Sequence, residues 1–122
     1  MGLGDTADRG DAAGEMGDAL PYVDLGAGRT AKTIFNSGVD TCAVLDNSRV
    51  KCWGANFYGS VGNGSTFPRG WAPGEMGDAL PYVDFGAGRT AKGAFVGGGC
   101  AVLDNDQLKC WGDNRYGQLG IG

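Results

Sequence analysis

The chain has 122 residues, of which 10 are basic and 14 acidic, so its formal net charge is -4. This length suffices for one compact domain or for two small units that share a core. The acidic balance argues against a nucleic-acid surface, which needs a basic stripe, and against docking on an anionic membrane. No apolar run approaches the roughly 20 residues of a membrane span, and no basic-then-apolar signal peptide follows Met1. We therefore expect a soluble chain that binds neither nucleic acid nor membrane.

Glycine supplies 25 of the 122 residues, about a fifth of the chain, against ordinary usage of roughly 7%. The enrichment accompanies 42% hydrophobic residues and a regular spacing. Glycine on a period indicates tight turns between short strands rather than disorder.

An internal repeat organises the chain. Residues 14–24 return unchanged as 74–84, an offset of 74 − 14 = 60, and residues 42–47 return as 100–105, an offset of 100 − 42 = 58. The two missing residues lie where 36–41 is matched by the shorter 96–99, which indicates a loop of different length. Such self-similarity indicates a repeat architecture. We place the first unit at residues 5–64 and the second at 65–122.

The predicted elements of one unit are short strands. In chain order they are an extended piece at 22–25, a strand at 31–35, and two strands at 42–45 and 49–53. The last two flank Asp46-Asn47-Ser48, which has the composition of a tight hairpin turn. No stretch keeps a helical apolar period over three turns. The prediction is an all-β fold with three to four short strands per unit, the content of one propeller blade.

The four cysteines form two pairs with nine intervening residues each. If Asn47 is the centre of the hairpin turn, Cys42 faces Cys52, and a facing antiparallel pair lies within disulfide reach. The second pair is placed in the same way, so we predict the disulfides Cys42–Cys52 and Cys100–Cys110. Structural zinc sites need closer spacing. Disulfides indicate an oxidising compartment, hence a secreted or extracellular parent protein.

Two blocks of the first unit, 42–47 (Cys-Ala-Val-Leu-Asp-Asn) and 50–54 (Val-Lys-Cys-Trp-Gly), resemble the repeat of the regulator-of-chromosome-condensation family. The second unit is more similar, because residues 111–122 carry the family's pattern Trp-Gly-x-Asn-x-x-Gly-Gln-Leu-Gly-x-Gly. The resemblance covers nearly the whole chain, and the cysteine-bearing version is similar to long bacterial repeat proteins. It implies two β-propeller blades per chain, whereas family members usually close seven blades into a ring.

Two blades leave open faces and unpaired strand edges on both sides. Roughly three stacked repeats are usually needed for stability, so we expect head-to-tail homo-oligomerisation. Such a contact closes into a ring or continues as a filament: three chains would give six blades and four would give eight. The alternative is that the chain is a fragment of a longer array or a designed protein.

The residue inventory argues against an enzyme. There is no histidine, so a Ser-His-Asp or Cys-His constellation is impossible. The only glutamates are the repeat-equivalent Glu15 and Glu75. The glycine cluster at 26–30 lacks the Lys-Ser/Thr ending of a phosphate-binding loop, and a turn explains it better. We expect no catalytic residue, no cofactor and no metal site.

Four aromatic residues recur at the spacing of the units: Trp53, Trp111, Tyr58 and Tyr116. They either pack between blades or line a rim that grips a partner.

Two further aromatics break the repeat. Trp71 and Phe67 stand where the first unit has Asp11 and Ala7. They are candidates for a contact specific to this protein, and burial under the neighbouring blade is the alternative.

These observations predict a non-catalytic structural or protein-binding scaffold that self-assembles. The alternative is a partner-binding regulator or an inhibitor, a fragment of a larger propeller. The family that the chain resembles includes a nucleotide-exchange factor for a small GTPase and a bacterial inhibitor of β-lactamase. This alternative therefore rests on fold analogy.

Overall fold

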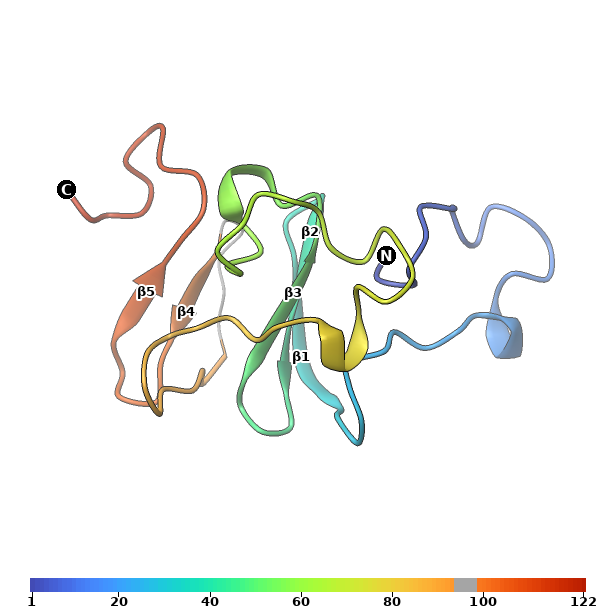
Figure 1. Cartoon of the computed structure of the whole chain (residues 1–122), viewed down its shortest axis with the longest axis horizontal. Helices are drawn as coiled ribbons and strands as arrows, with labels where there is room; N and C mark the ends of the chain where they lie inside the picture. The colour runs from blue at the N-terminus through green and yellow to red at the C-terminus, as the bar shows by residue number, and fades with distance from the viewer. Residues whose placement is uncertain (94–98) are drawn as a thin grey trace.

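The computed structural model describes residues 1–93 and 99–122. The first unit forms one antiparallel sheet in the order β1-β2-β3 (Figure 1), with β1 at Ala31–Asn36, β2 at Asp40–Leu45 and β3 at Val50–Gly54. The second unit forms a two-stranded antiparallel sheet of β4 (Cys100–Val102) and β5 (Leu108–Cys110).

The described residues contain no α-helix, so the predicted all-β fold is confirmed for this part of the chain. Three single turns of 3-10 helix interrupt the loops: η1 (Gly17–Ala19), η2 (Phe57–Gly59) and η3 (Gly77–Ala79). No helix of the described chain has the length and apolar character needed to span a bilayer.

The strands of the first unit lie within one or two residues of their predicted bounds. The extended piece expected at 22–25 is different, because it contains no strand. In the second unit, the described part of the equivalent pairing contains a bridge between Ala91 and Leu103, and the Lys92 N–H donates to the Val102 carbonyl at 2.9 Å. Residues 94–98 lie outside the described residues, and with them most of the shorter loop predicted at 96–99.

Both hairpins turn in the same way. The Leu45 N–H donates to the Arg49 carbonyl at 2.8 Å, and the Ser48 N–H donates to the Leu45 carbonyl at 2.9 Å. Ser48 adopts a left-handed conformation with φ 61°, which is typical of a three-residue hairpin loop. Asp106 takes the equivalent place in the second hairpin with φ 65°. The predicted turn centres are therefore confirmed.

The two units share their hydrophobic core. One cluster joins Val44, Val50 and Cys52 of the first unit to residues of the second, among them Val83, Phe85, Ala101 and Leu103. A second cluster packs Leu80 against Ala43, Leu45 and Trp53. Since burying one such side chain stabilises a fold by about 1.5 to 3 kcal/mol, each unit depends on the other for its stability.

The two ends of the chain lie far apart. Residues 1–25 extend to one end of the longest axis, and β4, β5 and the C-terminal residues lie at the other (Figure 1). The shared core lies between these two ends.

Candidate functional site

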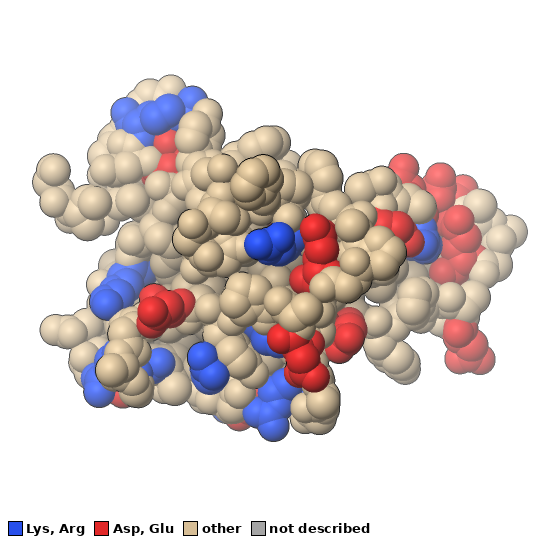
Figure 2. Space-filling model, in the orientation of Figure 1, with Lys and Arg blue, Asp and Glu red and all other residues tan. Residues whose placement is uncertain are grey.

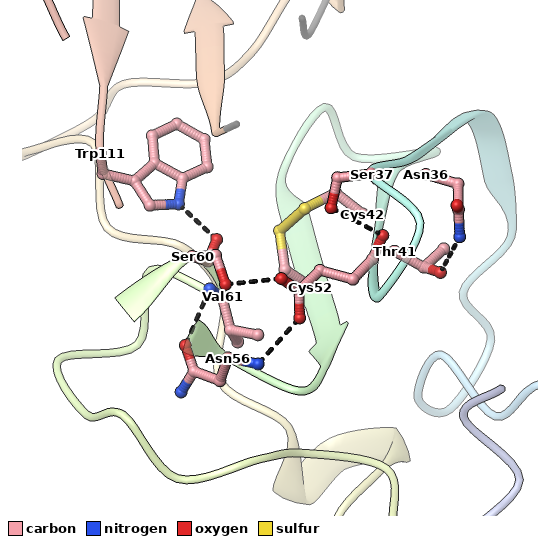
Figure 3. The surroundings of a disulfide bond; sticks show 10 residues. Asn36, Ser37, Thr41, Cys42, Cys52, Asn56, Ser60, Val61 and Trp111 are labelled. Atoms are coloured by element: carbon pink, nitrogen blue, oxygen red, sulfur yellow. Dashed lines mark hydrogen bonds between the residues drawn. A yellow bond between two sulfur atoms is a disulfide. The ribbon is translucent and has the colours of Figure 1, made fainter. Parts of the chain in front are cut away.

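The cysteines pair as predicted. Cys42 faces Cys52 across β2 and β3 with 4.1 Å between their Cα atoms, and Cys100 faces Cys110 across β4 and β5 at 4.0 Å. Figure 3 shows the first pair. Both pairs are at disulfide distance, which is compatible with an oxidising environment.

The junction between the units is centred on the buried Lys51, which is only 2% exposed. Its ammonium donates to the Leu25 carbonyl at 3.0 Å and to the Gly77 carbonyl at 2.7 Å. The same Nζ lies 4.8 Å from the centre of the Tyr82 ring. A buried ammonium needs such partners because leaving water is costly for a charge. Lys51 therefore ties the strand face of the first unit to η3 of the second.

Tyr82 lies over the end of the first hairpin. The Arg49 guanidinium carbon is 3.6 Å from the centre of its ring, a cation–π distance. The Asn47 side-chain amide donates to the Tyr82 hydroxyl at 3.3 Å. Beside it, the Val83 N–H donates to the Val50 carbonyl at 2.9 Å. Residues 77–83 thus cover β3, four of whose five residues are buried.

Asn56 anchors the loop that leads from the first unit to the second, and it is fully buried. Its side-chain amide donates to the carbonyls of Ser65 (2.9 Å) and Phe67 (2.7 Å). Its side-chain oxygen accepts from the Val61 N–H at 2.9 Å, and its own N–H donates to Asp40 at 2.8 Å (Figure 3). A buried amide with all these partners is a structural clamp.

The two repeated tryptophans differ in their surroundings. The Trp111 indole N–H donates to the Ser60 carbonyl at 2.8 Å (Figure 3), and its ring contacts Phe85 with 5.7 Å between centroids. Trp53 is 3% exposed. Its buried indole N–H has no hydrogen-bond partner among the described residues. Trp53 packs against Leu80, so it lies at the junction between the units and not on an exposed rim.

Tyr58 and Tyr116 are both exposed and are brought together by Arg115. The Arg115 guanidinium carbon lies 4.4 Å from the Tyr58 ring centre and 5.9 Å from that of Tyr116. Asp113 accepts hydrogen bonds from Arg115, which lowers the pKa of the Asp113 carboxyl and raises the pKa of Arg115. Arg115 is therefore charged and held between the two rings.

The aromatics that break the repeat lie elsewhere. Phe67 is exposed. Trp71 is 47% exposed and lines a shallow hollow of about 250 Å³ with Met1 and residues 5–8 of the first unit. The backbone N–H of Trp71 donates to the Glu75 carboxylate at 2.9 Å. The structure thus places Trp71 beside the N-terminal loop.

In the second unit, β5 is the counterpart of β3, but it is not covered as β3 is. Leu108 corresponds to the buried Val50 but is 60% exposed. Lys109 corresponds to Lys51 and is also exposed, and its Nζ donates to the Phe85 carbonyl at 2.8 Å. Because successive side chains of a strand point to opposite faces, the uncovered part is the edge of β5; we call this edge, with Leu108, Lys109 and Cys110, the open strand face.

Most of the segment that corresponds to 74–85 is uncovered as well, although Val23 and Leu25 pack against the second core cluster. Tyr22, the counterpart of Tyr82, is 98% exposed, and Met16 is 60% exposed. No residue of η1 is buried. We call residues 14–25 the open segment. The sequence analysis expected an open face on each side of the chain but did not identify these residues, although the recurrence of Lys51 as Lys109 and of Tyr82 as Tyr22 marked them.

The two ends differ in charge. Residues 1–25 contain six acidic residues and one arginine, a balance of 1 − 6 = −5, and Figure 2 shows acidic side chains gathered at that end. Residues 108–122 carry Lys109 and Arg115 against Asp113. The open segment is therefore acidic and the open strand face is weakly basic.

Within residues 1–93 and 99–122, no three side chains of His, Cys, Asp or Glu come together as a metal site. The expectations of no enzyme, cofactor or metal remain predictions from the residue inventory.

Comparison with known proteins gives one match. Residues 98–118, which include β4, the hairpin turn, β5 and the Trp-Gly segment, match the family model of the Regulator of chromosome condensation (RCC1) repeat. Searches of curated proteins and of solved structures returned no match. The chain therefore carries an RCC1-like repeat, the family that its residue pattern predicts.

Proposed function

We propose that the chain is a non-catalytic module that self-assembles head to tail into a β-propeller-type oligomer and serves as a structural or protein-binding scaffold. One observation carries the proposal. Within the chain, residues 74–85 cover β3. Their counterparts, residues 14–25, are largely exposed at one end of the molecule, and β5, the counterpart of β3, is exposed at the other end. A repeat that cannot bury its own face gains stability from a neighbour.

The exposed side chains supply the driving force. Leu108, Tyr22 and Met16 are each at least 60% exposed. Their counterparts Val50, Tyr82 and Met76 are buried or partly buried at the internal junction. Covering one large apolar side chain contributes about 1.5 to 3 kcal/mol, so several together favour association.

A contact of this kind is heterologous, because different surfaces of two identical chains meet. Whole chains of two blades would close as a ring of six blades from three copies or eight blades from four, or would continue as a filament. The two disulfides support placing the parent protein in a secreted or extracellular setting.

The mass of the particle in solution tests the proposal. Light scattering coupled to size exclusion should give a multiple of the 12.5 kDa chain mass, and the mass should fall on dilution. A folded particle of one chain at all concentrations would contradict self-assembly.

A second candidate is a regulator that binds another protein. The exposed group of Tyr58, Tyr116 and Arg115 favours it, since aromatic and arginine side chains are enriched where proteins bind one another. A monomer that retains its fold would leave this second candidate in place.

A further inference from the structure

We infer that the open segment of one copy, residues 14–25, seats on the open strand face of a second copy, in the way that residues 74–85 seat on β3 within one chain. This inference rests on the proposed self-assembly and specifies the surfaces and the polarity of the contact. The occupant of each open surface is a second copy of this chain.

The internal junction supplies the template. Three of its hydrogen bonds join the units directly: Lys51 Nζ to the Gly77 carbonyl (2.7 Å), the Asn47 amide to the Tyr82 hydroxyl (3.3 Å), and the Val83 N–H to the Val50 carbonyl (2.9 Å). Two of them use backbone carbonyls as acceptors, so they depend on the path of the chain and not on a particular acceptor side chain.

Every donor and acceptor of this template recurs at the open surfaces. On the strand face, Asn105, Leu108 and Lys109 correspond to Asn47, Val50 and Lys51, each at an offset of 58. On the segment, Gly17, Tyr22 and Val23 correspond to Gly77, Tyr82 and Val83, each at an offset of 60.

The contacts between two copies follow from this correspondence. Lys109 donates to the Gly17 carbonyl, Asn105 donates to the Tyr22 hydroxyl, and the Val23 N–H donates to the Leu108 carbonyl. Leu108 is covered as Val50 is. Residues 14–24 are identical to residues 74–84, so the open segment carries the same side chains that make the internal junction.

One contact of the template is lost. Arg49, which lies over the Tyr82 ring, is replaced by Gln107 in the second unit. An exposed cation–π contact contributes about 0.5 to 1 kcal/mol. The contact between copies is therefore weaker than the internal junction, and it dissociates on dilution before the chain unfolds.

The placement and the charge of the two surfaces select a second copy as the occupant. They lie at opposite ends of the long axis (Figure 1), so one chain cannot satisfy both. The segment end carries a balance of -5 (1 − 6), and the strand face presents the exposed Lys109. Opposite charge on surfaces that meet favours encounter in one orientation.

The indole N–H of Trp53, which has no partner among the described residues, lies against Gly2 of its own chain. Its counterpart in Trp111 is satisfied by the Ser60 carbonyl, and Gln118 is the residue of a second copy that corresponds to Ser60. Gly120 corresponds to Gly2. In the contact between copies, the last residues of the copy that provides the strand face would therefore occupy the same place as the first residues of the copy that provides the segment. One of these glycine segments must move aside for Gln118 to reach Trp53.

A pair of complementary variants tests the polarity. Tyr22→Ala removes the ring of the open segment but leaves the strand face intact. Leu108→Asp puts a carboxylate on the strand face, against an acidic segment, but leaves the segment intact. Each variant alone should be monomeric, with the dissociation constant raised about tenfold or more, as expected for a central interface residue. An equimolar mixture should restore one contact and give a dimer of 2 × 12.5 = 25 kDa.

Phe67→Ala is the matched control, since Phe67 is an exposed aromatic outside both open surfaces, and it should assemble like the wild type. Circular dichroism checks that each variant is folded, and Leu108→Ala serves if Leu108→Asp is not. If the wild type assembles and both variants assemble as well, or their mixture stays monomeric, this inference is wrong while self-assembly stands. A monomeric wild type would overturn the proposed function itself.

Discussion

Single side chains decide how the units are joined, and Asn56 is the clearest case. The residue pattern marks an asparagine three residues after the tryptophan in both units, as Asn56 and Asn114. The structure gives only Asn56 the Ser65 and Phe67 carbonyls as acceptors. Asn114 is exposed and keeps the one loop contact, accepting from the Leu119 N–H at 3.0 Å. The same residue is therefore a clamp in one unit and a loop residue in the other.

We expect Asn56→Ala to lower the free energy of unfolding by about 2 to 3 kcal/mol, because it leaves buried backbone groups without partners. Asn114→Ala is the matched control and should cost below about 1 kcal/mol, since its loop is open to water. Chemical denaturation of the two variants side by side measures the difference. Equal losses would show that the contacts of Asn56 to the second unit carry no stability.

Sequence reasoning reached the residue scale unevenly. The cysteine pairs could be placed because both partners lie at equal distances from a turn. Lys51 could not be recognised as a buried junction residue, because lysine is seldom buried and its acceptors are the distant Leu25 and Gly77 carbonyls. Only the folded chain brings these groups together.

At the scale of elements, the hairpin is the robust unit of this fold. Both hairpins combine a three-residue turn, a left-handed third residue and a cysteine pair three residues beyond the pair that closes the turn. Their local sequence determines this geometry, which is why it was predictable. The segments 22–25 and 82–85 were harder, since neither has a hairpin partner of its own. Val83 makes one backbone hydrogen bond to Val50 of β3, whereas Asp24 accepts one from Gly77 of η3.

The disulfides should contribute measurably to the stability of each hairpin. Each closes a loop with a sequence separation of 10, for which the chain-entropy model gives about 2 to 3 kcal/mol. Reducing both bonds should therefore lower the melting temperature by about 15 to 25 °C for a domain of this size.

Thiol titration provides the check on this prediction. The unfolded, unreduced chain should contain no free thiol, and four titratable thiols would show that the pairs are not bonded. Replacing Cys100 and Cys110 with alanine, compared with the same change at Cys42 and Cys52, separates the two hairpins.

At the scale of the whole molecule, the two units form one body with two unlike ends. Composition and repeat length predicted two incomplete blades, and the shared core agrees with that expectation. The bounds 5–64 and 65–122 stay a prediction, and so does the ring. The residue pattern could not predict which surface is covered, because this depends on contacts between segments that are 26 to 35 residues apart in the sequence.

The unequal charge of the ends gives a prediction at this scale. Raising the salt concentration from about 0.05 M to about 0.5 M shortens the range of electrostatic attraction to a few ångströms. We expect the apparent dissociation constant between copies to rise severalfold, since the acidic segment and Lys109 then attract each other less. Analytical ultracentrifugation at both salt concentrations measures it. A dissociation constant that is unchanged or lower at high salt would indicate that the contact is purely apolar.

The opposite placement of the two open surfaces has a consequence for growth. If copies associate as proposed, the product of each addition presents the same pair of open surfaces as the starting chain, so no step of the series is self-limiting. The size of the particle would then depend on the rotation that relates one copy to the next. A rotation that divides a full circle evenly, without a shift along its axis, would join the last copy to the first in a closed ring. Any other rotation would give a polar filament that grows while free chains remain.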